Sequence, residues 1–334
     1  MVYKVIGFLV ISIGLIVAGV WVEYRNVLSE PVITKQTVIF DITKGDSFNR
    51  ISDNLVKSGV EINPLWFKVI ARINEVADKL KAGEYVIEPG TTTPQLLSLF
   101  TAGKTRQYSI TFPEGWAFKD MIKAIEEHPK IVKNIINKPA KEIMASLGSE
   151  YQHPEGLFFP DTYFFDKDTS DEALLKRAYL KMQQVLSKQW QQREAELPLE
   201  SAYQALILAS IVEKETGKAS ERPIIAGVFV RRLRKGMLLQ TDPTVIYGMG
   251  ARYQGNIRKR DLLEKTAYNT YVIKGLTPTP IAMPGKEAIN AVMHPTKGSS
   301  LFFVARGDGS HVFSTTLKQH NRAVDIFQRK IKRK

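Results

Sequence analysis

Two glutamates, Glu213 and Glu215, close a largely apolar segment that reads Ala-Ser-Ile-Val-Glu-Lys-Glu-Thr at residues 209–216. A helix this apolar belongs in a protein core, so we expect at least one of the two carboxyl groups to be poorly solvated. Gly217 is a good residue to follow a helix, which places both glutamates in the last turn. Burial and the negative end of the helix dipole both raise a carboxyl pKa, as a general acid near neutral pH requires. The alternative, a glutamate neutralised by a buried Arg or Lys, is left open by the helix alone.

The two side chains leave the helix in different directions. On a wheel of about 100° per residue, Glu215 continues the apolar stripe through Leu208 and Val212, whereas Glu213 continues the side of Leu206 and Ala209. The helix alone does not decide which of the two carboxyl groups is the poorly solvated one. Glu213 is expected to pair with an arginine such as Arg231 or Arg232.

The composition excludes several other chemistries. The 334 residues contain no cysteine, so disulfides, thiolate metal sites and cysteine nucleophiles are ruled out. There is no phosphate-cradling Gly-rich motif, and Ser210 lacks a nucleophile elbow. The five histidines lack metal-like spacing, so neither a metal nor a cofactor is predicted, and each histidine is interpreted as structural or surface-exposed; they are His128, His153, His294, His311 and His320. Carboxylate chemistry remains, with Tyr, Asn, Gln and Thr residues that suit a carbohydrate site.

The first residues predict a membrane anchor. Residues 5–22 form an uncharged run of about 27 Å as a helix, enough for a bilayer core. Lys4 precedes the run, and Trp21 and Tyr24 lie where an aromatic belt is found. A cleaved signal peptide is disfavoured because no small-x-small site follows. We expect an uncleaved anchor at 1–24, with the rest of the chain outside the cytoplasm. The formal net charge of +13 suits an anionic partner, but this topology disfavours nucleic acid.

A small α+β unit is predicted after a linker at 25–36. Strand signals at 38–42 and 82–87 enclose two helices, one capped by Asp46 or Ser47 and one opened by Asn63-Pro64. A third helix is expected at 93–101. The stretch from Phe40 to Ile51 resembles the opening of a LysM glycan-binding module. We therefore predict a LysM-like βααβ subdomain over residues 37–106.

A second, mixed α+β domain is predicted over residues 107–334. Residues 155–163 are rich in aromatics with Gly and Pro breakers, which is typical of a packed loop or of an aromatic sugar platform. An amphipathic helix is expected at 171–192, ahead of the helix that carries the glutamates. Ser220 is expected to cap a following helix with Pro223 in its first turn. The apolar segments at 301–304 and 311–313 flank a turn signal and predict a hairpin.

Several ordered motifs then identify a family resemblance. They are Ala-Ser-Ile-Val-Glu-Lys-Glu-Thr (209–216), Leu-Gln-Thr-Asp-Pro-Thr-Val-Ile-Tyr-Gly (239–248), Tyr-Asn-Thr-Tyr (268–271), Gly-Leu-Thr-Pro-Thr-Pro-Ile-Ala-Met-Pro-Gly (275–285), Gly-Ser-His-Val-Phe-Ser (309–314) and Glu-Gly-Leu-Phe-Phe-Pro-Asp-Thr-Tyr (155–163). The chain resembles the YceG-like family of endolytic murein transglycosylases over roughly residues 38–320. One departure is Met283, where the family often has Asn or Thr.

The resemblance implies a single-pass protein of the inner (plasma) membrane whose catalytic domain lies in the periplasm. It implies a lyase that cleaves the β-1,4 bond between N-acetylmuramic acid and N-acetylglucosamine inside peptidoglycan strands, leaving 1,6-anhydro ends and terminating strand elongation. The family places its catalytic glutamate at the position of Glu215, in agreement with the wheel. Peptidoglycan strands, and with them peptidoglycan synthases, are the expected partners. The candidates for contacting substrate are Glu213, Gln240, Thr241, Asp242, Tyr247, Asn269 and Tyr271. The alternative is a non-catalytic peptidoglycan-binding component of the cell-wall synthesis machinery.

Overall fold

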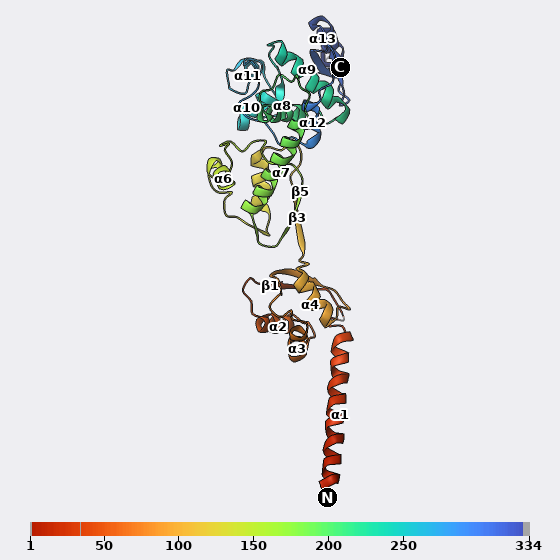
Figure 1. The fold of residues 1–334 in the computed structure, drawn as a ribbon. Helices are drawn as coiled ribbons and strands as arrows, with labels where there is room; N and C mark the ends of the chain where they lie inside the picture. The colour runs from red at the N-terminus through yellow and green to blue at the C-terminus, as the bar shows by residue number, and fades with distance from the viewer. Residues whose placement is uncertain (1, 34, 330–334) are drawn as a thin grey trace. The chain divides into compact units, whose positions relative to one another are not determined.

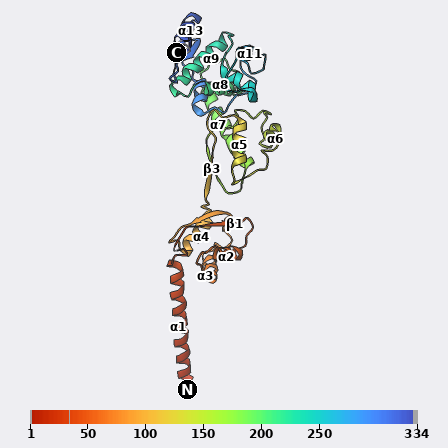
Figure 2. The same cartoon turned by 180° about the vertical axis from the view of Figure 1, so that it is seen from behind.

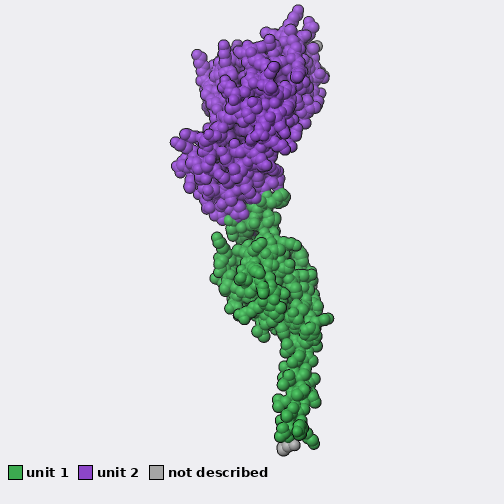
Figure 3. Space-filling model, in the orientation of Figure 1, with its two compact units in different colours: residues 1–108, 164–168 green, residues 109–163, 169–334 purple. Residues whose placement is uncertain are grey.

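The computed structural model describes residues 2–33 and 35–329, which form two compact units (Figure 3). The first unit contains the residues up to Tyr108 together with Phe164–Asp168. The second contains Ser109–Tyr163 and the chain from Thr169 onward. Each unit is described separately below.

The first unit begins with a long apolar helix, α1 (Val2–Ser29), none of whose residues is buried (Figure 1). By length and composition α1 can cross a membrane, although a signal sequence would have the same character. The expectation of an irregular linker at 25–36 is wrong, because α1 continues to Ser29. Beyond it Val32 and Ile33 are 3% and 4% exposed in the unit's core.

The rest of the first unit has the predicted order of strand, helix, helix and strand. Its elements are β1 (Val38–Ile42), α2 (Phe48–Lys57), α3 (Pro64–Ile73), β2 (Gly83–Ile87) and α4 (Thr93–Ala102). The two strands are antiparallel, with Val38 opposite Ile87. The helix starts follow from side-chain caps: the Ser47 hydroxyl accepts from the backbone N–H of Arg50, and the Asn63 side chain accepts from that of Leu65. Glycan binding by this LysM-like order of elements stays a prediction.

The second unit is mostly helical. Strands β3 (Gln107–Thr111) and β5 (Thr162–Asp166) pair with each other and each is divided between the two units, whereas the short strands β4 (Ile131–Val132) and β6 (Thr169–Ser170) lie in the second unit and run parallel. The predicted hairpin is confirmed as β7 (Phe302–Ala305) and β8 (His311–Ser314). The helices are α5 (Phe118–Glu127), α6 (Ala140–Ser146), α7 (Asp171–Gln191), α8 (Ala202–Glu215), α9 (Arg222–Arg234), α10 (Asp242–Met249), α11 (Lys259–Leu263), α12 (Lys286–Met293) and α13 (Leu317–Val324), with short turns η1 (Ala219–Glu221), η2 (Gly250–Arg252) and η3 (Asp325–Arg329).

Helix α8 is the centre of this unit. It packs against α7, α9, α10 and α12 (Figures 1 and 2), and every residue from 205 to 212 is buried. A helix that is apolar on all sides requires such surroundings. The helix ends at Glu215, so both glutamates lie in its last turn as predicted. Its C-cap, Thr216, is extended (φ −149°), and the chain leaves the helix without a left-handed residue.

One local expectation is wrong. Ser220 does not cap the helix after α8, because it lies inside the turn η1, and α9 starts at Arg222 with Pro223 in its first turn. Of the two interpretations of the aromatic segment at 155–163, the structure favours the packed loop. Leu157 and Phe158 are completely buried there, and the Phe158 ring stacks on Phe118 at 5.2 Å between ring centres.

Candidate active site

A cavity of about 410 Å³ lies beside the C-terminal end of α8. Its walls come from α8, α9, the segment leading into α10, the hairpin β7–β8, and α13 and the turn after it. The polar side chains that line it are Glu215, Arg232, Gln240, Thr241, Asp242, Tyr271, His311, His320 and Gln328. Apolar walls are supplied by residues that include Leu239, Phe302, Phe303 and Leu317. The cavity therefore combines a carboxyl group with hydrogen-bonding and aromatic surfaces, as a sugar site requires.

Glu215 is the cavity's carboxyl group of raised pKa. Burial raises the pKa of Glu215 to about 7, and the neighbouring negative charge of Asp242 acts in the same direction. The Thr241 hydroxyl, which donates to Glu215 Oε1, partly opposes this shift, as does the charge of Arg232. A carboxyl of this pKa is about half protonated at neutral pH, which suits a group that donates a proton and then takes one back.

The backbone leading into α10 holds Thr241 against Glu215. Gln240 is in the left-handed region (φ 52°), which is uncommon outside glycine, and its N–H donates to the carbonyl of Thr270 (3.0 Å). The next N–H, of Thr241, donates to the Thr270 hydroxyl at 3.1 Å. The Thr244 hydroxyl lies 2.8 Å from the same hydroxyl. This buried network fixes the donor that contacts Glu215.

Asp242 is the second carboxylate that lines the cavity. Its Oδ1 accepts a hydrogen bond from the phenol of Tyr271 at 2.6 Å. Burial, together with the contact to Asp242, raises the pKa of Tyr271, so the phenol stays protonated and remains a donor. Asp242 is thus a hydrogen-bonded carboxylate at the first residue of α10, next to Thr241.

A buried cation connects three walls of the cavity. Arg232 is 7% exposed, and its guanidinium donates to the carbonyls of Leu301 (2.7 Å) and Leu239 (2.8 Å). It also lies over the ring of Phe302, 5.1 Å from its centre. Arg232 therefore ties α9 to the hairpin and to the segment before α10, and it places a positive charge near Glu215.

Glu213 lies outside the cavity, in a separate ion-pair site. Its Oε1 is 3.1 Å from Nη2 of Arg222, and its Oε2 accepts the backbone N–H of Gly285 at 2.9 Å. A Cβ at Gly285 would lie 1.8 Å from Oε1 of Glu114, so a larger residue there would require the Glu114 side chain to move. Glu213 therefore pairs with an arginine as expected, but the partner is Arg222 and the predicted Arg231 or Arg232 was wrong. Arg231 and Arg232 instead donate to backbone carbonyls.

Two other candidates also lie away from the cavity lining. The phenol of Tyr247 donates to Oε2 of Glu155 at 3.1 Å. Asn269 is 1% exposed, and its amide group donates to three backbone carbonyls, which makes it a brace for the loop after α11. Of the seven predicted contact residues, the cavity brings together Gln240, Thr241, Asp242 and Tyr271 with Glu215.

The cavity wall formed near the C-terminus was not predicted from the sequence. His311 and His320 were interpreted as structural or surface residues, but both line the cavity. The signal was available in the motif at 309–314, where His311 and Phe313 are two residues apart and therefore lie on the same face of a predicted strand. Within residues 2–33 and 35–329, no group of three or more His, Asp or Glu side chains is arranged to hold a metal ion.

Comparison with known proteins assigns the class. The model of the YceG-like family matches residues 40–326, and the chain belongs to this family. The resemblance deduced from the motifs is thereby confirmed.

Particular relatives carry a more specific name. The chain is 33% identical over 333 residues to an endolytic murein transglycosylase of Bacillus subtilis, covering 94% of this chain and 91% of that protein. It is 28% identical to an endolytic murein transglycosylase of Streptococcus pneumoniae, covering 96% of this chain but 64% of that longer protein. A crystal structure of a yceG-like protein from Listeria monocytogenes superposes with a TM-score of 0.53 at 29% identity, covering 86% of this chain and 99% of that one.

Proposed function

We propose that this chain is a membrane-anchored lytic transglycosylase that cleaves the β-1,4 bond between N-acetylmuramic acid and N-acetylglucosamine within peptidoglycan strands. The observation that carries the proposal is Glu215, a carboxyl group with a pKa of about 7 in a cavity lined by hydrogen-bonding and aromatic side chains. Membership in the YceG-like family and the names of the relatives support the same reaction class.

In the proposed mechanism Glu215 acts twice. Its protonated carboxyl group gives a proton to the glycosidic oxygen, and the C1–O bond breaks with its electron pair passing to that oxygen. The C6 hydroxyl oxygen of the muramyl residue then bonds to C1, and the carboxylate of Glu215 takes the hydroxyl proton. The product is a 1,6-anhydro ring, and Glu215 is protonated again. Because the attacking hydroxyl belongs to the substrate, it has a high effective concentration and no second carboxylate is needed to activate water.

The remaining residues that were predicted to contact substrate divide into three groups. Thr241 holds the Glu215 carboxyl group, while Gln240, Tyr271 and Asp242 offer polar atoms to the sugars along the same wall. Phe302 and Phe303 provide apolar surface for the sugar faces. The third group does not line the cavity and holds other segments of the unit through the contacts described above; it consists of Glu213, Tyr247 and Asn269.

The first unit supplies the location of the enzyme in this proposal. Helix α1 anchors the chain in the plasma membrane with the second unit on the outer, periplasmic side, where nascent strands are made and where cleavage would terminate their elongation. Peptidoglycan synthases would then work beside it, and the LysM-like elements would contact glycan. A reporter enzyme fused after Ser29 should be active only outside the cytoplasm. A soluble, processed protein that starts near residue 20 would contradict the anchor.

The reaction is tested by its products. Detergent-purified full-length protein should release fragments from purified sacculi that end in 1,6-anhydro-muramic acid, lighter by one water than hydrolysis products in mass spectrometry. Reducing muramic ends as the main product would mean that a carboxylate activates water, and Asp242 would be the first suspect. Binding without any cleavage would favour a non-catalytic role in the cell-wall machinery.

A further inference from the structure

His311 is held in a fixed orientation at the edge of the cavity. Its Nδ1 lies 2.6 Å from Oε2 of Glu221, and its backbone N–H donates to Oε1 of the same carboxylate at 3.2 Å. The ring of Phe303 meets the imidazole edge to face, with the ring centres 5.5 Å apart. The imidazole is therefore fixed on one side by a carboxylate and on another by an aromatic ring.

This arrangement selects one tautomer of the neutral imidazole. Although burial acts to raise it, hydrogen bonds from His311 hold the pKa of Glu221 below its ordinary value, so Glu221 is a carboxylate and an acceptor. The ring proton of His311 is then on Nδ1, and Nε2 carries a lone pair. Among the described residues Nε2 has no hydrogen-bond partner, while His311 lines the same cavity as Glu215.

We propose that His311 contacts the substrate, its Nε2 accepting a hydrogen bond from a hydroxyl group of the saccharide bound beside Glu215. Glu221 is then a positioning residue that accepts the Nδ1 proton and fixes the orientation of the ring. The proposal rests on the proposed transglycosylase function and adds to it a second, uncharged acceptor.

A neutral acceptor suits this position better than another carboxylate. Asp242 already raises the pKa of Glu215, and its Oδ1 is occupied by Tyr271. A lone pair on imidazole can orient a sugar hydroxyl without adding negative charge. Protonation of His311 would remove that acceptor and would also place a positive charge near Glu215, favouring the ionised form of the acid.

The consequence is that activity depends on a hydrogen-bond acceptor at position 311. The other titratable or charged groups that face this histidine or share its cavity are Glu215, Glu221, Arg232, Asp242, Tyr271 and His320, with Lys218 pairing with Glu221 behind it. Glu215 has to be protonated, so activity is lost as pH rises through about 7. Removal of the acceptor at position 311 should lower activity without moving this limb, so the two contributions are separable by mutation.

The test uses detergent-purified full-length protein and a defined glycan strand, with kcat and KM measured from about pH 4 to pH 9. His311→Ala should lower kcat/KM at least about 10-fold, the loss expected for a hydrogen bond that orients a reacting group. His311→Gln, which keeps a carbonyl acceptor, should retain more activity than His311→Ala. Glu221→Gln should lower kcat/KM by less than His311→Ala does, because the imidazole keeps its acceptor and loses only the carboxylate that fixes the ring.

The control is His294→Gln, an exposed histidine after α12, which should keep the wild-type profile. Thermal unfolding is measured for each variant, and if His311→Ala does not fold, the milder Glu221→Gln variant decides. Wild-type kcat/KM in His311→Ala or in Glu221→Gln, or equal losses in His311→Ala and His311→Gln, would overturn the proposal. Absence of anhydro products from the wild-type protein would instead reject the proposed function.

Discussion

The two carboxyl groups at the end of α8 are two residues apart, yet their surroundings differ in kind. The negative charge of Glu213 is compensated, because the Arg222 guanidinium binds one carboxylate oxygen and the N–H of Gly285 donates to the other. Glu215 receives a single hydroxyl donor from Thr241 and shares its cavity with the negative Asp242. Burial raises the pKa of both, but only for Glu215 does the shift bring the value to about 7. The helix brings both to its last turn, and their partners decide how strongly each carboxyl group is compensated.

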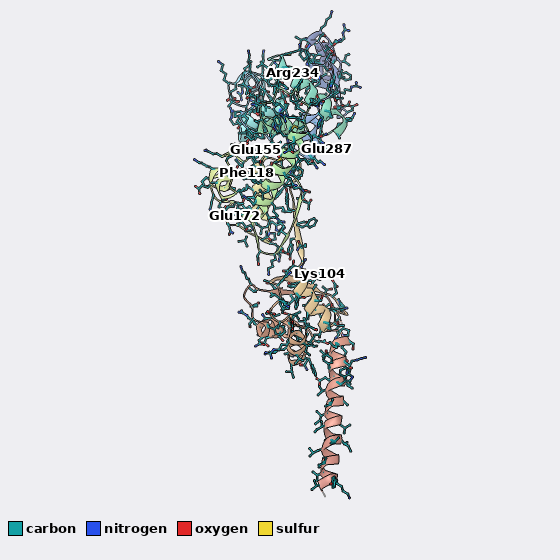
Figure 4. All side chains as sticks on the ribbon, viewed as in Figure 1. Lys104, Phe118, Glu155, Glu172, Arg234 and Glu287 are labelled. Atoms are coloured by element: carbon teal, nitrogen blue, oxygen red, sulfur yellow. The ribbon has the colours of Figure 1, made fainter. Side chains whose placement is uncertain are left out.

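A third carboxyl group sharpens this comparison. Glu155, labelled with Phe118 in Figure 4, is 4% exposed, and burial raises its pKa to about 7. Its oxygens accept the N–H of Phe118 at the start of α5 and the phenol of Tyr247 in α10. It does not line the cavity beside Glu215. A raised pKa therefore identifies a buried carboxyl, and a cavity is needed before that group can act on a substrate.

The largest expected effect is that of Glu215→Gln. The amide keeps the size of the side chain and removes the transferable proton, so turnover of a glycan strand should fall at least about 100-fold. Folding should be retained, since a charge that opposes the helix dipole is removed. The matched control is Glu287→Gln, an exposed glutamate of α12 labelled in Figure 4. Near-wild-type turnover in the Glu215 variant would refute its catalytic role.

Glu213→Gln should act mainly on stability. Breaking its pair leaves the largely buried Arg222 without its closest carboxylate, so we expect a loss of about 1–3 kcal/mol in the free energy of unfolding. Turnover of the folded protein should stay within about 10-fold of wild type. Urea unfolding and glycan turnover are measured on the same preparations. A stable variant with the activity loss expected for Glu215 would move the catalytic role to Glu213.

Glu155→Gln should have the smallest effect on activity and a specific effect on the pH dependence of stability. The pKa of Glu155 is about 7 in the folded protein, against 4.5 for a glutamate in water, so the folded state binds more protons between these values. Its contribution to stability is complete below about pH 4.5 and is lost as pH rises through about 7. The wild-type protein should therefore lose more stability than the variant over this interval, by up to a few kcal/mol. Parallel slopes in the two unfolding series would show that Glu155 is already ionised when folded.

The sequence predicted those parts of the fold that depend on local patterns. The apolar helix that ends at Glu215, the cap at Ser47 and the hairpin at 302–314 all follow from periodicity or turn chemistry. Gln240, Thr241, Asp242 and Tyr271, which were chosen from the family motifs, line one cavity with Glu215. The direction of the two glutamates was predictable because helical geometry is regular.

What could not be predicted depends on contacts between distant segments. The partner of Glu213 is Arg222, at the start of α9, whereas the arginines further along α9 looked equally suitable by sequence distance. Asn269 and Tyr247 have residue types suited to sugar binding, and nothing local shows that their polar atoms are taken by carbonyls and by Glu155. His311 was missed because its role requires knowing that β8 lies next to Glu221.

The order in which the cavity's walls occur along the chain has a consequence during synthesis of the protein. Glu215 is synthesised about a hundred residues before β8 and α13, which supply His311 and His320. A chain that is still emerging, or one truncated before residue 300, has the acidic residue but lacks the hairpin wall and the carbonyl of Leu301 that Arg232 binds. The cavity is complete only once the chain has been made through α13. We therefore expect an unfinished copy of the chain to be inactive.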